Sequence, residues 1–196
     1  MSEGVRRVSC VFTAFAVSVI FLACRGANRT ELSLANMQSL ESLLRQGVLM
    51  LRKGDRVSLQ RAEAAFELGY ELAPDDPRVL DGLGAVAFLY GRQSSAKQRF
   101  EQAIRSSPKY ARAYVHLALV AERRGDKMEA LRLLREALRL DPLEFRGRNN
   151  LAGILFDGAT TSEERAVALQ ELLKARFESP LGDRIIEENI KRMRTE

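Results

Sequence analysis

Apolar residues recur at intervals of three and four positions over most of the chain, with charged residues between them. The clearest stripe is made of Ala130, Leu133, Leu134, Ala137 and Leu138. This spacing places the apolar residues on one face of a helix, which such a helix buries against a neighbour. The pattern therefore predicts an all-α chain in which helix packs on helix.

Residues that begin and end helices stand at the edges of these segments. Asp126 with Glu129, and Thr161 with Glu164, have the three-residue spacing of a capping box, in which each side chain accepts a hydrogen bond from the other residue's backbone. Glycine is common just after a helix because it adopts left-handed backbone angles without strain. The glycines placed where helices should end are Gly91, Gly125 and Gly158.

The helices are predicted to come in pairs, because the sequence repeats itself after 34 residues. Residues 77–110 align with residues 111–144 without a gap. The matched positions are Leu80 with Tyr114, Leu83 with Leu117, Gly84 with Ala118, Ala87 with Ala121, Gly91 with Gly125, Ala96 with Ala130, Phe100 with Leu134, Ala103 with Ala137, and Pro108 with Pro142. A fixed period of this length is typical of proteins in which helical pairs stack on one another.

This unit resembles the tetratricopeptide repeat, a 34-residue helix-turn-helix with small residues at fixed places and a proline near its end. The resemblance implies a solenoid over residues 33–180. Its repeats are placed at about 40–76, 77–110, 111–144 and 145–180. The outer repeats match less well: Arg148 stands where the inner repeats carry Leu80 and Tyr114, which argues against tight packing of that helix.

The segment 181–196 follows the last repeat and is amphipathic. Ile186, Ile190 and Met193 share one helical face, and charged residues occupy the other. A stack of helical pairs leaves its last apolar face open, and a helix with a polar outer side closes it. We therefore expect a C-terminal capping helix; the alternative is a helix that binds a partner.

The N-terminus carries an apolar run of 16 residues, 8–23, behind two arginines. A membrane-spanning helix needs about 20 apolar residues and a secretory signal about 7 to 15, so the length favours a signal peptide at 1–23. The last residues, from Phe21 to Cys24, resemble the lipobox of bacterial lipoproteins, although Leu, Val or Ile is usual at the place of Phe21. The resemblance implies acylation of Cys24, followed by a short tether over 24–32. The alternative is an uncleaved signal anchor.

Composition and charge argue against several classes of function. The formal net charge is +5, with lysine and arginine spread along the chain and no aromatic platform beside them, so nucleic-acid binding is not expected. His116 is the sole histidine, and no metal-type Cys/His spacing or glycine-rich phosphate loop is present. We therefore expect no catalytic residues, no metal, no cofactor and no small-molecule substrate.

In the tetratricopeptide family the first helix of each repeat lines a concave groove. The resemblance places Arg78, Arg112 and Arg146 at the second position of three successive repeats, 34 residues apart. It also assigns to the groove Phe88, Leu119 and Phe156. Such a groove suits a protein or peptide partner with carboxylates, because guanidinium groups pair with them. The alternative is that these arginines are ordinary solvated surface.

The clamp that some members use for the C-terminus of chaperones is not expected, since Asp81, Ala85 and His116 occupy its places. The resemblance as a whole implies a non-enzymatic, lipid-anchored scaffold or assembly factor of the bacterial cell envelope. The outer membrane, on its periplasmic side, is favoured, and the layout is similar to that of pilotins of pilus secretins. The alternative is an adaptor held in the inner membrane by an uncleaved anchor.

Overall fold

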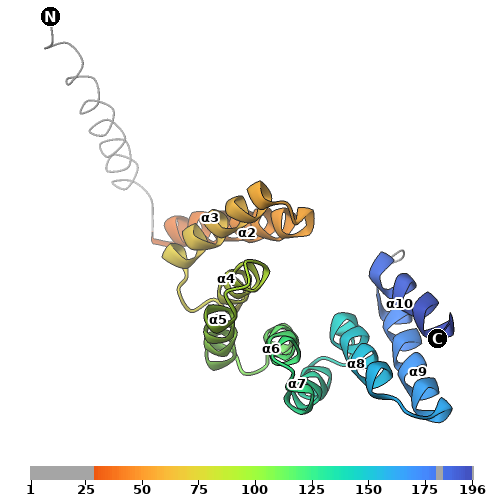
Figure 1. The fold of residues 1–196 in the computed structure, drawn as a ribbon. Coiled ribbons are helices and arrows are strands. Elements are labelled where there is room, and N and C mark those ends of the chain that lie inside the picture. The colour runs from red at the N-terminus through yellow and green to blue at the C-terminus, as the bar shows by residue number, and fades with distance from the viewer. Residues whose placement is uncertain (1–28, 180–182, 196) are drawn as a thin grey trace, which may run out of the picture. The chain divides into compact units, whose positions relative to one another are not determined.

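The computed structural model describes residues 29–179 and 183–195, and side chains from residue 35 onward (Figure 1). The predicted signal peptide at 1–23 and the predicted acylation site, Cys24, lie outside these residues. Two compact units are distinguished, Met1–Ser42 and Leu43–Glu196. The described residues form helices without strands. The helices are α2 (Arg29–Lys53), α3 (Arg56–Leu72), α4 (Pro77–Leu89), α5 (Gln93–Ser106), α6 (Ala111–Arg123), α7 (Lys127–Leu140), α8 (Phe145–Gly158), α9 (Ser162–Glu178) and α10 (Arg184–Thr195).

Within the second unit the helices form hairpins that follow one another along the chain. Helix α4 pairs with α5, α6 with α7 and α8 with α9, and each pair packs on the next. The all-α repeat fold predicted from the sequence is confirmed, with one hairpin for each of the segments 77–110 and 111–144. Helix α2 begins at Arg29, earlier than the boundary of 33 expected for the solenoid.

The helix ends follow the predicted signals with two differences. Gly158 is the last residue of α8 and lacks the positive φ of Gly91 and Gly125. Thr161 and Glu164 form a complete capping box. The side chain of Asp126 accepts a hydrogen bond from the backbone of Glu129, but the Glu129 carboxylate pairs with Arg132 at 2.7 Å instead of returning to the cap. An arginine three residues along the helix outcompetes the backbone amide for this carboxylate.

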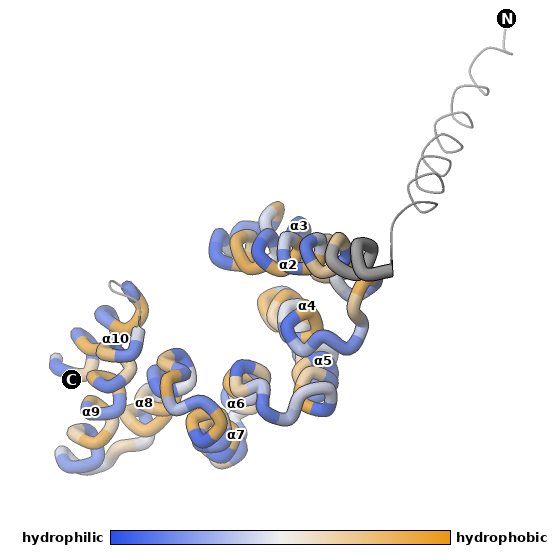
Figure 2. The backbone as a smooth tube through the Cα atoms, turned by 180° about the vertical axis from the view of Figure 1, so that it is seen from behind, coloured by the Kyte–Doolittle hydropathy of each residue, from blue (hydrophilic) through white to orange (hydrophobic). Residues whose placement is uncertain are grey.

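Small residues lie where two helices of a hairpin cross. Ala96, Ala130 and Ala137 are fully buried, and a Cβ added to Gly84 would overlap the ring of Phe100. Close crossing of backbones therefore explains why the repeat keeps glycine or alanine at these places. Hydrophobic and hydrophilic residues alternate along the helices (Figure 2), as expected of helices that bury one stripe.

Helix α10 closes the last hairpin. Ile186, Ile190 and Met193 are buried against α8 and α9, in a cluster that includes Leu172. The amide of Asn189 also donates to Asn149 Oδ1 of α8 at 3.0 Å. The capping helix predicted from the sequence is confirmed, and its apolar face is occupied by the chain itself.

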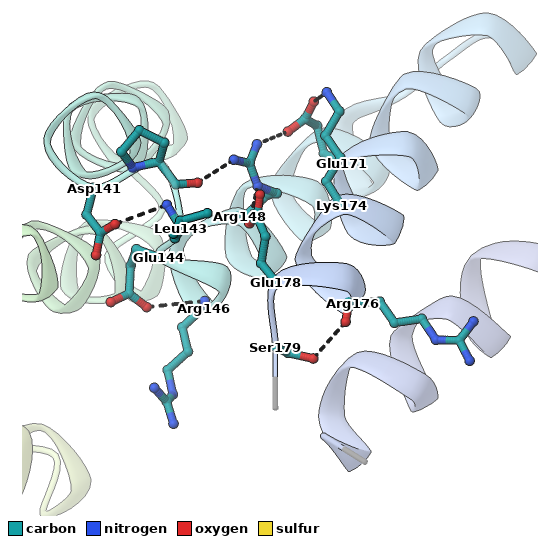
Figure 3. A network of polar contacts seen from close by, with 11 residues as sticks. Asp141, Leu143, Glu144, Arg146, Arg148, Glu171, Lys174, Arg176, Glu178 and Ser179 are labelled. Carbon is teal, nitrogen blue, oxygen red and sulfur yellow. Dashed lines mark hydrogen bonds and ion pairs between the residues drawn. The ribbon is translucent and has the colours of Figure 1, made fainter. Parts of the chain in front are cut away.

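Arg148 lies at a position where the inner repeats carry an apolar residue, and its guanidinium makes polar contacts there. Its guanidinium donates to Glu178 at 2.8 Å, to Glu171 at 2.9 Å and to the carbonyl oxygen of Pro142 at 2.7 Å (Figure 3). Its side chain is 14% exposed. The first helix of the last hairpin is thus packed tightly, by a shielded ion cluster in place of the apolar contact of the inner repeats.

Candidate functional site on the first helices

The first helices of successive hairpins lie side by side, since α4 contacts α6 and α6 contacts α8. We call the surface that they form the first-helix surface. Its residues are Arg78, Phe88, Arg112, His116, Leu119, Arg123 and Arg146, with the buried Asp81 beneath His116. It contains every predicted groove residue except Phe156.

The three predicted arginines each occupy the second residue of their helix. The positive end of the helix dipole makes this an unfavourable place for a cation, so helix stability does not explain them. Two of these helix ends already hold a carboxylate, since Asp76 and Glu144 accept hydrogen bonds from the backbone amides of Arg78 and Arg146. The feature that the first-helix surface repeats on three neighbouring helices is therefore the arginine itself, whose guanidinium attracts anions.

The three guanidinium groups differ in their surroundings. Arg78 is paired with the carboxylate of Asp76, which also caps α4, at 2.7 Å. Arg112 is exposed. Arg146 is exposed, with its guanidinium 4.6 Å from the centre of the Phe145 ring, and its side chain points away from the Arg148 cluster (Figure 3). The guanidinium groups of Arg112 and Arg146 thus face solvent, whereas the charge of Arg78 is offset by Asp76.

The apolar part of the predicted groove needs a correction. Phe156 is only 6% exposed and belongs to the core beneath α10, because the capping helix covers it. It is not available as an anchor for a partner. Phe88 is half-buried, and the guanidinium of Arg123 lies over its ring at 3.9 Å while donating to its carbonyl oxygen. Leu119 is half-buried as well.

A polar cluster that sequence reasoning missed lies between α4 and α6. The carboxylate of Asp81 is 2.6 Å from Nδ1 of His116 and accepts a hydrogen bond from the hydroxyl of Tyr110 at 3.4 Å. Asp81 is 4% exposed. Burial, and then the charge of Asp81, raises the pKa of Tyr110 well above its ordinary value. Asp81 and His116 stand 35 residues apart, one more than the repeat, and that spacing alone could have placed them on facing helices.

Two hollows among the described residues are each lined by residues of both first and second helices. One of about 540 Å³ is lined by Tyr70, Leu80 and Arg105, among others, and the second, of about 390 Å³, by Lys97, Leu117 and other residues. Neither is lined by a predicted groove residue. Within residues 29–179 and 183–195 no group of three or more His, Cys, Asp or Glu side chains is arranged to hold a metal ion.

Comparisons with known proteins agree with this architecture. A family model described as tetratricopeptide repeat matches residues 85–142 and 121–180. The chain is 31% identical over 100 residues to the TPR repeat-containing thioredoxin TTL4 of Arabidopsis thaliana. The aligned segment covers 51% of this chain and 14% of that protein. The chain therefore spans a small part of this relative.

Solved structures share the fold at low sequence identity. A thermophilic TPR protein of Thermus thermophilus superposes with a TM-score of 0.65 at 21% identity, over 80% of this chain and 81% of that one. The O-GlcNAc transferase of Thermobaculum terrenum gives 0.61 at 20% identity, over 77% of this chain and 27% of that one. The first TPR of Spaghetti, bound to an HSP90 peptide, gives a TM-score of 0.51 at 20% identity, over 60% of this chain and 90% of that one.

Proposed function

Because the chain is a tetratricopeptide repeat protein, a fold that serves protein–protein interaction, we propose that it is a scaffold of the bacterial cell envelope. Its first-helix surface takes an acidic segment of a partner protein. A structural neighbour offers a parallel: the HSP90 peptide bound to Spaghetti has the sequence SRMEEVD, which is rich in carboxylates. The proposed role is binding and involves no reaction, metal or cofactor.

The observation that carries the binding proposal is the position of Arg78, Arg112 and Arg146. Each is the second residue of its helix, α4, α6 or α8. Helix α6 contacts both α4 and α8. Guanidinium groups form charge-assisted hydrogen bonds with carboxylates, and arginine does so with two parallel donors. A row of such groups fits an extended segment with several Asp or Glu side chains.

The binding proposal is tested with a rhodamine-labelled hexa-aspartate peptide and the full chain in nonionic detergent, by fluorescence anisotropy. We expect the double variant Arg112→Ala/Arg146→Ala to weaken binding by about tenfold, the loss of one or two charge-assisted hydrogen bonds. Arg135→Ala/Arg139→Ala is the matched control, since it also removes two exposed arginines, here from the second helix α7. Equal losses in both variants would show unspecific charge attraction and refute the proposal.

The membrane attachment rests on the sequence of the N-terminal segment. In the described residues no helix is long and apolar enough to cross a membrane. Attachment is proposed through acyl chains on Cys24, because two or more such chains hold a protein stably on a bilayer whereas one does so only marginally. We place the scaffold at the outer membrane, on the periplasmic side.

Intact-mass spectrometry of the protein extracted from membranes of its own host tests the attachment. We expect a mass that lacks residues 1–23 and carries acyl chains, and we expect Cys24→Ala to lose both changes. A full-length mass without acyl chains in both proteins would instead support an uncleaved anchor over residues 8–23.

A further inference from the structure

His116 is the sole histidine of the chain, and it lies on the first-helix surface. Histidine is the side chain whose ordinary pKa places its change of charge between pH 5 and 8. The side chain of His116 is 24% exposed, whereas that of its partner, Asp81, is 6% exposed. The ring of His116 is thus held by the buried carboxylate of Asp81, and part of the ring reaches the surface.

The contact with Asp81 decides which ring nitrogen faces outward. An ionised carboxylate only accepts hydrogen bonds, so in the 2.6 Å contact Nδ1 carries the proton and donates a hydrogen bond to Asp81. Nε2 makes no hydrogen bond to the described residues, and none of their buried side-chain nitrogen or oxygen atoms lacks a partner. Nε2 of His116 is therefore not fully buried, in keeping with the 24% exposure of the side chain.

The protonation of Nε2 changes what this atom offers a ligand. In the neutral ring Nε2 is an acceptor and repels a carboxylate, whereas in the imidazolium it is a charged donor. Arg112 stands one helical turn earlier on the same helix, at the spacing where side chains are neighbours. Protonation thus adds a second cationic donor beside Arg112.

The other groups around the ring leave this assignment intact. From α5 the ring of Phe100 packs against His116 with the centres 5.2 Å apart, and α7 meets α6 through apolar side chains such as Leu134. The hydroxyl of Tyr110 is directed to Asp81. The charged residues at the start of α8 are Glu144, which is buried and caps that helix, and Arg146, which is exposed.

We propose that His116 is a proton-controlled binding residue for a carboxylate of the acidic segment. When His116 is protonated, Nε2–H donates to that carboxylate while Nδ1–H stays on Asp81; when the ring is neutral, the donor is lost. The scaffold therefore holds its partner more tightly in mildly acidic surroundings. This inference rests on the proposed binding of an acidic segment to the first-helix surface.

The test measures the affinity of rhodamine-labelled hexa-aspartate for the full chain in nonionic detergent at about pH 5.5 and about pH 8, at constant ionic strength. Aspartate stays ionised over this range, so the probe does not change. We expect affinity to fall about tenfold from the lower to the higher pH, as one charge-assisted hydrogen bond is lost. His116→Asn should bind equally at both, with the affinity of the unaltered chain at the higher pH.

His116→Asn is chosen because its amide can still donate to Asp81 while it cannot titrate. Glu122→Gln is the matched control on the same helix. Partial burial and then the charge of Asp157 raise the pKa of Glu122, so this carboxyl group is another group of α6 that could give a pH dependence. This variant should keep the pH dependence. Circular dichroism at both pH values checks that each variant is folded.

Two results would overturn the inference and are told apart. If hexa-aspartate binds but the pH dependence is absent, or persists in His116→Asn, the role of His116 is refuted and the proposed function stands. If hexa-aspartate does not bind at either pH, the acidic-segment function fails and the role of His116 fails with it.

Discussion

Asp81 lies buried between α4 and α6 and accepts hydrogen bonds from His116 of the following repeat and from Tyr110, the last residue of its own repeat. A buried carboxylate is costly unless its acceptors are satisfied, and here His116 and Tyr110 do so. One residue thereby joins two repeats and fixes the orientation of the ring that reaches the surface. The sequence could place these residues on facing helices, but not show that their side chains meet, because rotamers are decided by packing.

Tyr110 gives a prediction at this scale. Its pKa is raised above the ordinary value of 10.0, by burial first and by Asp81 second, so the folded chain keeps the phenol proton that the unfolded chain loses. The contribution of Tyr110 to stability should therefore be constant below about pH 10 and should fall as the pH rises above it. Tyr110→Phe should show a smaller fall. Urea unfolding at pH 8 and pH 10.5 measures this, and equal falls in the two proteins would contradict it.

At the scale of the element, the repeat could be predicted because its requirements are local. Small residues at fixed intervals, such as Gly84 and Ala118, mark where two helices of a hairpin cross, and glycines with positive φ, such as Gly91 at 76° and Gly125 at 83°, end the first helices. Arg148 could not be interpreted in this way. Its partners lie 23 and 30 residues away, and the choice of an ion cluster over an apolar contact depends on both.

A pair of glycines tests the crossing argument. Gly84→Ala should destabilise the chain by about 2 kcal/mol, because the added methyl group overlaps the Phe100 ring. Gly153→Ala is the matched control: it also lies within a first helix, but nothing stands within 4 Å of the added Cβ, so it should stabilise by about 0.5 kcal/mol. Free energies from urea unfolding give both values, and equal signs would refute the argument.

The ion cluster of α8 and α9 gives a second prediction at this scale. Arg148→Leu restores the apolar residue of the inner repeats but leaves Glu178, which is 14% exposed, without its cation. Glu171, which is 19% exposed, keeps only its ion pair with Lys174. We expect a loss of about 3 kcal/mol in the free energy of unfolding. Adding Glu171→Gln and Glu178→Gln to this variant should recover part of it, because the only charge then left without its partner is Lys174, which is 47% exposed and solvated. A larger loss in the triple variant would show that the helix depends on the carboxylates themselves.

At the scale of the molecule, stacked hairpins touch only their neighbours, so stability is expected to be local. The core follows this rule: Phe156, Leu172 and Ile190 form one cluster with α10, while Leu134 belongs to the preceding one. This division also explains the misplaced groove residue. The register of the repeat put Phe156 on the first-helix surface, whereas the cap that follows the last repeat draws it into the core.

Removal of the cap tests this locality. A chain that ends at Ser179 uncovers Phe156 and Leu172, and α8 and α9 lose the apolar contacts that α10 supplies. We expect amide hydrogen exchange to speed up by more than about tenfold in α8 and α9, because local opening there costs less free energy. Exchange in α4 and α5 should be unchanged, since α10 contacts only α8 and α9 among the described helices. Faster exchange along the whole chain would instead show that the hairpins unfold as one cooperative unit.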